Sequence, residues 1–324
     1  MKLFAGKPGL IGVEVSARWI KASQGEGPTR VTTRLERKGS GTLTKDEAAT
    51  LAGVFDRAGF REQRIVLVPA REMLVMETLE LPPRSSGAPL EQLARVELAR
   101  SHRWDPASFE VGLWELPTPG RGGELSHMFA AALPFARSEP MLDACDNAGL
   151  RVHAIDVPAN ALARAFGPTA PDAMLDIGWS GAMLCVMHAG VVVYERTIDE
   201  GGLQQLIEPA AKRLDIQREA VESLLLARGA DSTLSAEVRG PVTEYLDVLT
   251  SEVQRSLAYM AHRYLGWQFR TLGVSGEGAA LLGLRERLTA ALGIEVTAPP
   301  APASHTLAAG ASRFNASAAR KEAA

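Results

Sequence analysis

The chain has 324 residues, of which 46% are hydrophobic and 23% charged, so it is long enough for two globular lobes with separate cores. Its formal net charge of −3 argues against nucleic acid or an anionic membrane as a partner. The only cysteines, Cys145 and Cys185, are far apart and form no CxxC, so they suggest neither a disulfide framework nor a zinc site. No apolar run is long enough to span a membrane, and Pro8 and Glu14 interrupt the stretch that a signal peptide would need. We therefore expect a soluble, cytoplasmic protein.

Two stretches of the sequence predict the same order of elements, which is three short strands joined by tight turns and then a helix. In the first stretch these are LIGVEV (10–15), WIKAS (19–23), RVTTRLE (30–36) and TKDEAATLAGVFDRAG (44–59). In the second they are AMLDI (173–177), AMLCVM (182–187), VVVYERTI (191–198) and GGLQQLIEPAAKRL (201–214). Thr44 is placed to cap the first helix and Gly59 to end it. A period of roughly 160 residues indicates a duplicated domain rather than a solenoid repeat.

Each stretch also closes with a strand, a helix and a second strand. In the first, MFAAALP (128–134) leads through SEPMLDACDNAGL (138–150) to RVHAIDV (151–157) and a further helix, ANALARAF (159–166). In the second, TLGVSGEGA (271–279) leads through LLGLRERLTAALG (281–293) to IEV (294–296). We therefore expect an α/β protein with two lobes, over residues 1–168 and 169–298.

Two insertions separate the shared parts, and a tail follows them. The first insertion covers about 81–128 and contains the helix PLEQLARVELARSHRW, whereas the second is a helical stretch over about 208–267. From residue 299 the chain is rich in Ala, Pro and Ser, which bury little apolar surface. We expect residues 299–324 to form a disordered tail.

An acidic residue stands near the end of the first strand in each stretch, Glu14 in one and Asp176 in the other. A turn follows each strand, and the second turn contains Gly178, Ser180 and Gly181. Such a turn can bring backbone N–H groups toward an anion while the carboxylate holds a metal ion. A glycine-bearing turn is more often only a turn, but two of them facing each other would hold nucleotide phosphates between two lobes.

A third segment, VSGEGAALLGL (274–284), is a strand that runs into Gly276, Glu277 and Gly278 before a helix. Small residues at this point would let a bulky planar ligand lie against the backbone. None of the three segments establishes a site alone, but together they indicate nucleotide binding.

The order of these segments resembles that of the actin-like ATPases, and within them the PilM family of type IV pilus assembly proteins; the chain is also similar to FtsA. IGVEVSARWIK and MLDIGWSGAML resemble the two phosphate hairpins, TIDEGGLQQLI the glycine pair and helix after the second hairpin, and VSGEGAALLGL the adenosine motif. AGLRVHAIDVPANALARAF and LEQLARVELARSHRWDPASFEVGLWEL are similar to PilM segments, the latter to a small subdomain inserted in the first lobe. The resemblance covers the chain to about residue 298. It implies an actin-like fold of two ribonuclease-H-like lobes with inserted subdomains and a nucleotide cleft between the lobes.

The resemblance implies ATP and Mg²⁺ as cofactors and gives roles to individual residues. Glu14 and Asp176 would hold Mg²⁺ through water. Asp156 would position a hydrolytic water, or it would cap the helix that follows it. The residues implied to contact the nucleotide are Gly12, Glu14, Ser16, Lys21, Asp176, Gly178, Ser180, Gly181, Gly201, Gly202, Glu222, Gly276, Glu277 and Gly278.

Three departures from the family pattern predict slow or absent hydrolysis. Ser16 follows Glu14 at the position where nucleotide-binding relatives usually have glycine, and it adds a Cβ where the backbone must come close. Glu277 places an acid in the adenosine turn. Leu225 stands where the family pattern, a Glu followed three residues later by a Lys, would put the lysine after Glu222.

Two classes of function are left open. The first is a cytoplasmic docking component of a type IV pilus or related secretion machine, held at the inner face of the inner membrane by protein partners. It would bind the cytoplasmic N-terminal tail of a PilN-like bitopic membrane protein through the first lobe and its insertion, and it could also self-associate. The second is a small-molecule kinase or ATPase of the same superfold. The insertion favours the first, because it resembles the PilM subdomain.

The tryptophans Trp104, Trp114 and Trp267 could mark a peptide groove. Large aromatic side chains are more often core anchors, so the sequence leaves both interpretations open.

Overall fold

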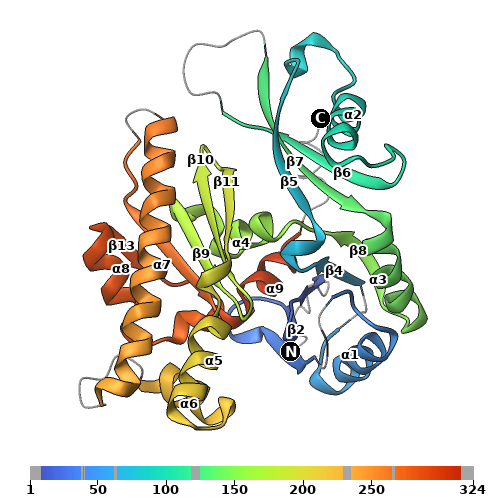
Figure 1. Cartoon of the computed structure of the whole chain (residues 1–324). Helices are drawn as coiled ribbons and strands as arrows, with labels where there is room; N and C mark the ends of the chain where they lie inside the picture. The colour runs from blue at the N-terminus through green and yellow to red at the C-terminus, as the bar shows by residue number, and fades with distance from the viewer. Residues whose placement is uncertain are drawn as a thin grey trace, which may run out of the picture. The chain divides into compact units, whose positions relative to one another are not determined.

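The structure is a computed structural model that describes residues 9–37, 39, 41–61, 64–117, 125–228, 235–264 and 267–314. The chain divides into two units, which are shown together in Figure 1. The first unit consists of Met1–Ala165 and Leu307–Ala324, and the second of Phe166–Thr306. The chain therefore passes from one unit to the other twice.

The first unit contains a five-stranded sheet in the order β3-β2-β1-β4-β8. Its strands are β1 (Ile11–Val15), β2 (Trp19–Gln24), β3 (Val31–Glu36), β4 (Arg64–Val68) and β8 (Arg151–Ile155). Its helices are α1 (Lys45–Ala58), α3 (Phe135–Asn147), α4 (Pro158–Phe166) and α9 (Thr306–Ala311), with short 3₁₀ turns η1 (Gly27–Thr29) and η2 (Arg71–Met73). The predicted cap of α1 is confirmed: Thr44 and Glu47 form a reciprocal capping box, and Gly59 ends the helix at φ 84°.

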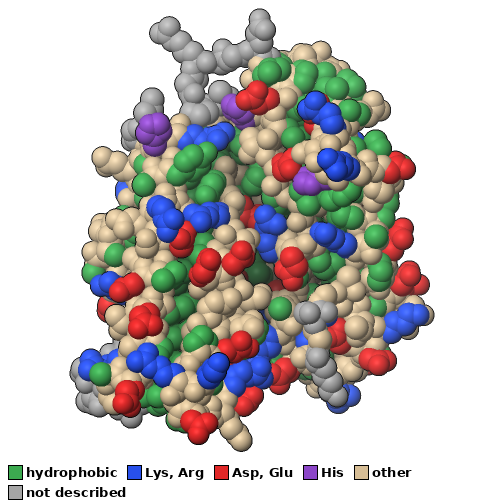
Figure 2. Space-filling model, viewed as in Figure 1, with side chains coloured by type: hydrophobic (Ala, Val, Ile, Leu, Met, Phe, Trp, Pro, Cys, Tyr) green, Lys and Arg blue, Asp and Glu red, His purple; other side chains and the backbone are tan. Residues whose placement is uncertain are grey.

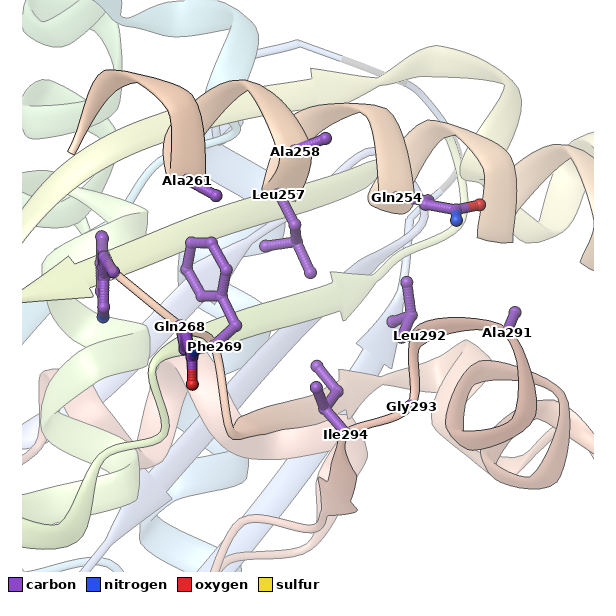
Figure 3. A pocket seen from close by; sticks show the side chains of 11 residues that line it. Gln254, Leu257, Ala258, Ala261, Gln268, Phe269, Ala291, Leu292, Gly293 and Ile294 are labelled. Atoms are coloured by element: carbon purple, nitrogen blue, oxygen red, sulfur yellow. The ribbon is translucent and has the colours of Figure 1, made fainter. Parts of the chain in front are cut away.

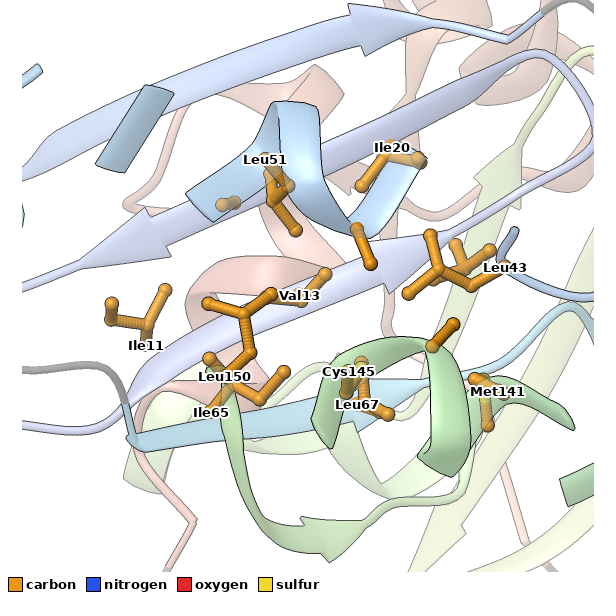
Figure 4. Close-up of a cluster of buried hydrophobic side chains, with 14 of the residues drawn as sticks. Ile11, Val13, Ile20, Leu43, Leu51, Ile65, Leu67, Met141, Cys145 and Leu150 are labelled. Carbon is orange, nitrogen blue, oxygen red and sulfur yellow. The ribbon is translucent and has the colours of Figure 1, made fainter. Parts of the chain in front are cut away.

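Helices α1 and α3 pack together against this sheet and bury one apolar core (Figure 4). Val13 and Leu67 contribute to it from β1 and β4, Leu51 from α1, and Met141 and Cys145 from α3. These residues are completely buried. Burial of this size stabilises the unit by about 1.5–3 kcal/mol for each large apolar side chain.

The insertion in the first unit is a second, three-stranded sheet with one helix. It consists of β5 (Val75–Leu81), η3 (Arg84–Ser86), α2 (Leu90–His102), β6 (Phe109–Glu115) and β7 (Ser126–Pro134), in the sheet order β5-β7-β6. The predicted bounds of 81–128 are too narrow, because β5 and β7 pair along their whole length from Val75↔Ala132 to Leu81↔Ser126.

The prediction that MFAAALP is the counterpart of TLGVSGEGA in the repeat is wrong. MFAAALP belongs to β7 of the insertion, and the fourth strand of the main sheet is β4, RIVLV. Both are short apolar runs before a helix or loop, so only strand pairing distinguishes them.

The second unit repeats the main sheet of the first, in the order β11-β10-β9-β12-β13. Its strands are β9 (Ala173–Ile177), β10 (Ala182–His188), β11 (Val191–Ile198), β12 (Thr271–Gly276) and β13 (Glu295–Thr297). Its helices are α5 (Leu203–Leu214), α6 (Arg218–Arg228), α7 (Ala236–Arg263) and α8 (Leu284–Leu292), with 3₁₀ turns η4 (Gly167–Thr169), η5 (Asp199–Gly201), η6 (Glu277–Ala280) and η7 (Ala303–His305). The helical stretch predicted over about 208–267 corresponds to the end of α5, to α6 and to α7.

The two main sheets have the same strand directions, which supports the predicted duplication. In each sheet the first two strands are antiparallel, and the first strand is parallel to the fourth, as in β1 with β4 and β9 with β12. The fourth strand is in turn parallel to the edge strand, β8 or β13. Helix α1 packs on α3 as α7 packs on α8.

The prediction of a disordered tail is wrong for the residues that form η7 and α9. Ala308, Ala309 and Ala311 of α9 are at most 1% exposed. Their small side chains allow the helix to come very close to its neighbours, which compensates for the small surface of each methyl group. Residues 315–324 of the predicted tail lie outside the described residues.

Charged side chains on the visible surface follow the pattern that the sequence predicts. Figure 2 shows acidic and basic side chains interspersed over this face of the molecule. Within the described ranges, no helix combines the length and the apolar character that crossing a membrane requires.

Candidate functional site

The first predicted hairpin is formed by β1 and β2, and it contains a buried ion pair. Glu14 and Lys21 are opposite each other in the antiparallel register. Lys21 Nζ donates to Glu14 Oε1 at 2.9 Å, and the two side chains are only 4% and 8% exposed. The ammonium thus already compensates the carboxylate that was predicted to hold Mg²⁺.

Ser16 builds the turn of this hairpin. Its hydroxyl donates to the carbonyl of Trp19 at 2.9 Å and accepts from the Trp19 N–H at 3.3 Å. The backbone N–H of Ser16 donates to the same carbonyl. The side chain that was expected to crowd a phosphate is therefore used locally, in closing the turn.

Gly12 is adjacent to α9 in the same unit. A Cβ at Gly12 would lie 1.9 Å from the carbonyl oxygen of Ala308 and 2.5 Å from the N–H nitrogen of Ser312. The absence of a side chain at Gly12 is thus required by helix packing, and a phosphate contact of this residue stays a prediction.

Asp156 follows β8 and is 5% exposed. Its Oδ2 pairs with the guanidinium of Arg164, and its Oδ1 accepts from the N–H of Val157 at 2.9 Å. The backbone N–H of Asp156 donates to Leu67 of β4 at 2.7 Å. Of the two roles predicted for Asp156, these contacts favour the structural one at the start of α4. A carboxylate that is paired with arginine is a weak base for a hydrolytic water.

The second predicted hairpin joins β9 to β10 and is bonded to the start of α5. The N–H of Gly178 donates to Gly181 at 3.0 Å and closes the turn. The N–H groups of Leu203 and Gln204 donate to the carbonyls of Gly178 and Trp179 at 3.0 and 2.9 Å. These N-terminal amides of α5 therefore hold the hairpin rather than an anion.

The glycine pair before α5, Gly201 and Gly202, permits the close contact between the second hairpin and the start of α5. A Cβ on Gly202 would lie 2.5 Å from the nitrogen of Gly181, and one on Gly201 would lie 2.8 Å from Ala182 Cβ. The carbonyl of Gly201 accepts from the hydroxyl of Tyr245 in α7 at 2.7 Å, and burial raises the pKa of that hydroxyl above its ordinary value.

Asp176 lies at the end of β9, where it is half-buried. Its Oδ1 accepts from the hydroxyl of Ser275 in β12 at 2.6 Å, and the two residues are neighbours in the parallel register. This bond orients the carboxylate. Mg²⁺ is usually bound by one or two carboxylates together with phosphate oxygens and water, so the position of Asp176 fits an ion that a nucleotide would bring.

The predicted adenosine turn is packed against the end of β9. A Cβ on Gly276 would lie 2.3 Å from the carbonyl oxygen of Ile177, and one on Gly278 would lie 2.2 Å from Ile177 Cγ2. Helix α6, which carries Glu222, contacts the turn η6 that begins at Glu277. Leu225, which replaces the family lysine, is completely buried.

The structure therefore brings the predicted residues together as two groups, one in each unit. One group lies on the β1–β2 hairpin, with Asp156 directly after β8, the strand two places from β1 in the sheet. The other surrounds the ends of β9 and β12. Among the described residues, no group of three or more His, Cys, Asp or Glu side chains could hold a metal ion.

Sequence reasoning missed three side chains that hold these groups in place: Ser275, Arg164 and Tyr245. Ser275 precedes the predicted glycine turn directly, and Arg164 follows Asp156 by two helical turns. Both spacings could have been noticed. Tyr245 is 44 residues from its partner Gly201, and nothing in the local sequence indicates that contact.

Three solved structures show the fold. A PilM-PilN type IV pilus biogenesis complex is similar with a TM-score of 0.75 and 20% identity, over 94% of this chain and 98% of that one. The ethanolamine utilization protein EutJ of Carboxydothermus hydrogenoformans has a TM-score of 0.61 and 16% identity, over 96% and 91% of the two chains. MreB5 of Spiroplasma citri bound to ADP has a TM-score of 0.54 and 12% identity, over 97% and 98%. The fold is therefore that of the actin-like ATPases, as predicted.

A family model identifies the chain more closely than these structures do. No curated protein sequence matches the chain. The model described as type IV pilus assembly protein PilM matches residues 116–305, more than half of the chain. The matched part runs from directly after β6 to the end of η7. The chain belongs to the PilM family of type IV pilus assembly proteins.

Proposed function

We propose that this protein is an actin-like docking component of a type IV pilus or related secretion machine. In this proposal it lies at the inner face of the inner membrane, binds the cytoplasmic N-terminal tail of a PilN-like bitopic membrane protein, and also binds Mg-ATP. Membership in the PilM family supports the proposal, and so does the likeness to a PilM-PilN complex. The observation that carries the docking assignment is the apolar second face of the three-stranded sheet in the insertion.

One face of this sheet is covered by α2. Phe109, Val111 and Ala130 point to that side and form a core with Leu98 of the helix. His102 of α2 contacts Glu77 of β5 at 2.7 Å. This arrangement fixes which residues of the alternating strands point the other way.

The opposite face carries apolar side chains at its centre. Phe129 of β7 contacts the ring of Trp114 in β6 edge-on, with centroids 5.0 Å apart, and Trp114 is partly exposed. Gly112, also on this face, is exposed and has no atom within 4 Å of a Cβ built on it. An extended tail could place apolar side chains here and pair its backbone with an edge strand, β5 or β6.

Tail binding can be tested without removing the insertion. Gly112→Arg adds a long charged side chain to the proposed surface at a position with open space. Val96→Arg is the matched control, because Val96 is 56% exposed on α2, on the covered side of the same subdomain. The probe is a synthetic peptide of the cytoplasmic N-terminal tail of a PilN-like bitopic membrane protein from the same organism.

Titration calorimetry should show that Gly112→Arg weakens binding of the tail peptide at least ~10-fold, which is about 1.4 kcal/mol, while Val96→Arg leaves it unchanged. Equal affinity of the two variants would exclude this face as the docking surface. Failure of the unmutated protein to bind the tail would exclude the docking function itself.

For the nucleotide, we propose that the second hairpin and Asp176 hold phosphates and Mg²⁺. Turnover would be slow or absent, because Asp156 is held by Arg164 and Leu225 replaces a polar contact. Binding to the folded state raises stability by mass action, by about 2.7 kcal/mol at a ligand concentration of 100 times Kd.

Thermal unfolding with and without millimolar Mg-ATP tests this part. The unmutated protein should melt at a higher temperature with Mg-ATP, and Asp176→Ala should remove the increase. An unchanged melting temperature for the unmutated protein would mean that the site no longer binds nucleotide, and would leave the docking proposal intact.

A further inference from the structure

The second unit contains a groove that is unsuited to an anion. It has a volume of about 440 Å³ and lies between α7 and the end of α8 (Figure 3). None of its eleven lining residues, Trp267 among them, is charged, so a phosphate group there would have no cation to pair with. The lining precedes the parallel strands β12 and β13, whereas the second hairpin and the turn η6 follow the other ends of β9 and β12. Phosphate groups bound by this unit therefore need a cation outside the groove.

The residues predicted to contact nucleotide in the second unit include acids and no base. Asp176, Glu222 and Glu277 are the acids, and the others are glycines and Ser180. Lys21 belongs to the first unit and is buried in its ion pair with Glu14. Carboxylates repel nearby phosphate oxygens wherever Mg²⁺ does not stand between them. A phosphate chain at the second hairpin therefore calls for a further cation.

Arg218 is a cation that the structure places against this hairpin. It is the first residue of α6, and its guanidinium carbon lies 5.5 Å from the centroid of the Trp179 ring. Trp179 stands between Gly178 and Ser180 in the hairpin turn and is partly exposed. Helix α6 also contacts η6, in the predicted adenosine segment. One helix thus reaches both the phosphate turn and the adenosine turn of this unit.

Arg218 lies on the face of α6 that carries the other predicted contact. Glu222 follows it by one helical turn and Leu225 by two, so the three side chains share one side of the helix. Leu225 is completely buried, Glu222 is half-buried and Arg218 is exposed. The face is therefore buried at one end and open to solvent at the other, where the guanidinium lies.

The contacts that Arg218 makes do not explain its position. Its Nε and Nη2 donate to one oxygen, Oε1 of the adjacent Glu219, at 3.3 and 3.0 Å, and the two side chains are 43% and 65% exposed. Ion pairs and cation–π contacts as exposed as these contribute little to stability. A positive charge in the first turn of a helix also opposes the helix dipole. The guanidinium can therefore exchange both partners for a stronger acceptor.

We propose that Arg218 binds a phosphate group of the nucleotide held by the second hairpin. A guanidinium donates two parallel bonds to two phosphate oxygens, whereas its two donors share one carboxylate oxygen of Glu219 in the structure. On binding, the side chain leaves Glu219 and the ring of Trp179. The inference rests on the nucleotide binding proposed above, and adds the cation and the part of the ligand that it recognises.

Titration calorimetry with Mg-ATP and with adenosine tests this role. Arg218→Gln should weaken Mg-ATP binding at least ~10-fold, the loss expected for a hydrogen bond between charged groups, and should leave adenosine binding unchanged. Arg218→Lys should keep part of the affinity, because it retains the charge but not the fork. Arg270→Gln is the matched control, since Arg270 is also exposed but precedes β12, at the opposite end of that strand from η6.

The indole of Trp179 provides a second readout. Its N–H signal in ¹H–¹⁵N NMR spectra is identified by its loss in Trp179→Phe. Without nucleotide, the signal should differ between the unmutated protein and Arg218→Gln, because only the former has a guanidinium over the ring. At saturating Mg-ATP the two signals should converge, because the guanidinium has left the ring. Signals that stay as far apart as before would contradict the proposal.

The outcomes separate this proposal from the one on which it rests. If the unmutated protein binds Mg-ATP and Arg218→Gln binds it equally well, Arg218 is not a phosphate ligand, and nucleotide binding stands. If Arg218→Gln weakens Mg-ATP and adenosine equally, the side chain acts through the fold of the hairpin and the proposal is wrong. If adenosine binds too weakly to measure, the Trp179 signals decide. If the unmutated protein does not bind Mg-ATP, both proposals are excluded.

Discussion

Because α9 packs closely against α4, Gly310→Ala is the most direct test of the fold near the C-terminus. A Cβ at Gly310 would lie 1.7 Å from the carbonyl oxygen of Ala161, 2.6 Å from the carbonyl carbon of Ala161 and 3.1 Å from the nitrogen of Ala165. All three atoms belong to the backbone of α4, so no side chain can swing aside to relieve the clash. One methyl group must therefore displace α9 from α4.

The expected cost follows from two opposing terms. Ala is favoured over Gly in a helix by about 1 kcal/mol, and overpacking a well-packed interior costs about 1–3 kcal/mol. The cost of so short a Cβ contact would be higher than this overpacking range. The helix α9 would then detach from α4 instead of keeping the strained contact. Detachment exposes Leu307, Ala308, Ala309 and Ala311, which is worth about 5 kcal/mol at about 0.8 kcal/mol for each buried methyl or methylene group. We expect a net loss of about 2–4 kcal/mol.

Equilibrium urea unfolding followed by circular dichroism measures this loss. Gly53→Ala is the matched control, because Gly53 is also helical and its Cβ would meet only the movable guanidinium of Arg57 at 3.4 Å. The control should gain about 1 kcal/mol from helix propensity. If Gly310→Ala gains as much as Gly53→Ala, the close packing of α9 on α4 is wrong.

Three further outcomes are expected. Lys21→Met should lower the free energy of unfolding in urea by about 3–5 kcal/mol, because it removes the ammonium beside the buried carboxylate of Glu14. The double variant with Glu14→Gln should recover most of that free energy, and no recovery would contradict the pairing. Tyr245→Phe should cost about 1 kcal/mol in the same assay, since it leaves the carbonyl of Gly201 without its 2.7 Å bond, and a neutral result would argue against that bond. Burial raises the pKa of the Cys145 thiol from 9.0 to about 12, so the folded chain keeps a proton that the unfolded chain loses. Stability should therefore fall as pH rises above about 9, and a thiol reagent at pH 8 should not label Cys145 until the chain unfolds; rapid labelling of the folded protein would contradict this burial.

Much of the fold could be predicted from local patterns. The three-strand openings of both units, the capped helix α1 and the duplication all follow from alternation, turn residues and capping chemistry, each of which acts within a few neighbouring residues. The actin-like fold and the PilM family followed from the order of these segments. The ends of the hairpins, with Glu14 and Asp176, were also correctly located.

Pairing between distant segments could not be predicted in this way. RIVLV and MFAAALP are both short apolar strands, and only the formed sheets show that the first lies beside β1 and the second beside β5. For the same reason the bounds of the insertion were placed six residues too late at one end and six too early at the other.

The sequence alone determined the first three strands of each unit and most of the helices, because those depend on residues close together in the chain, whereas β4, β5 and α9 were not predicted. Only the tertiary structure decided what Gly12 and Gly310 are next to, since each is required by a backbone that arrives from far along the sequence. The alanine-rich segment after residue 299 is the clearest case. Its composition buries little surface when considered locally, yet the same small side chains let α9 approach α4 and β1 more closely than larger residues could, and that fit is a property of the assembled unit.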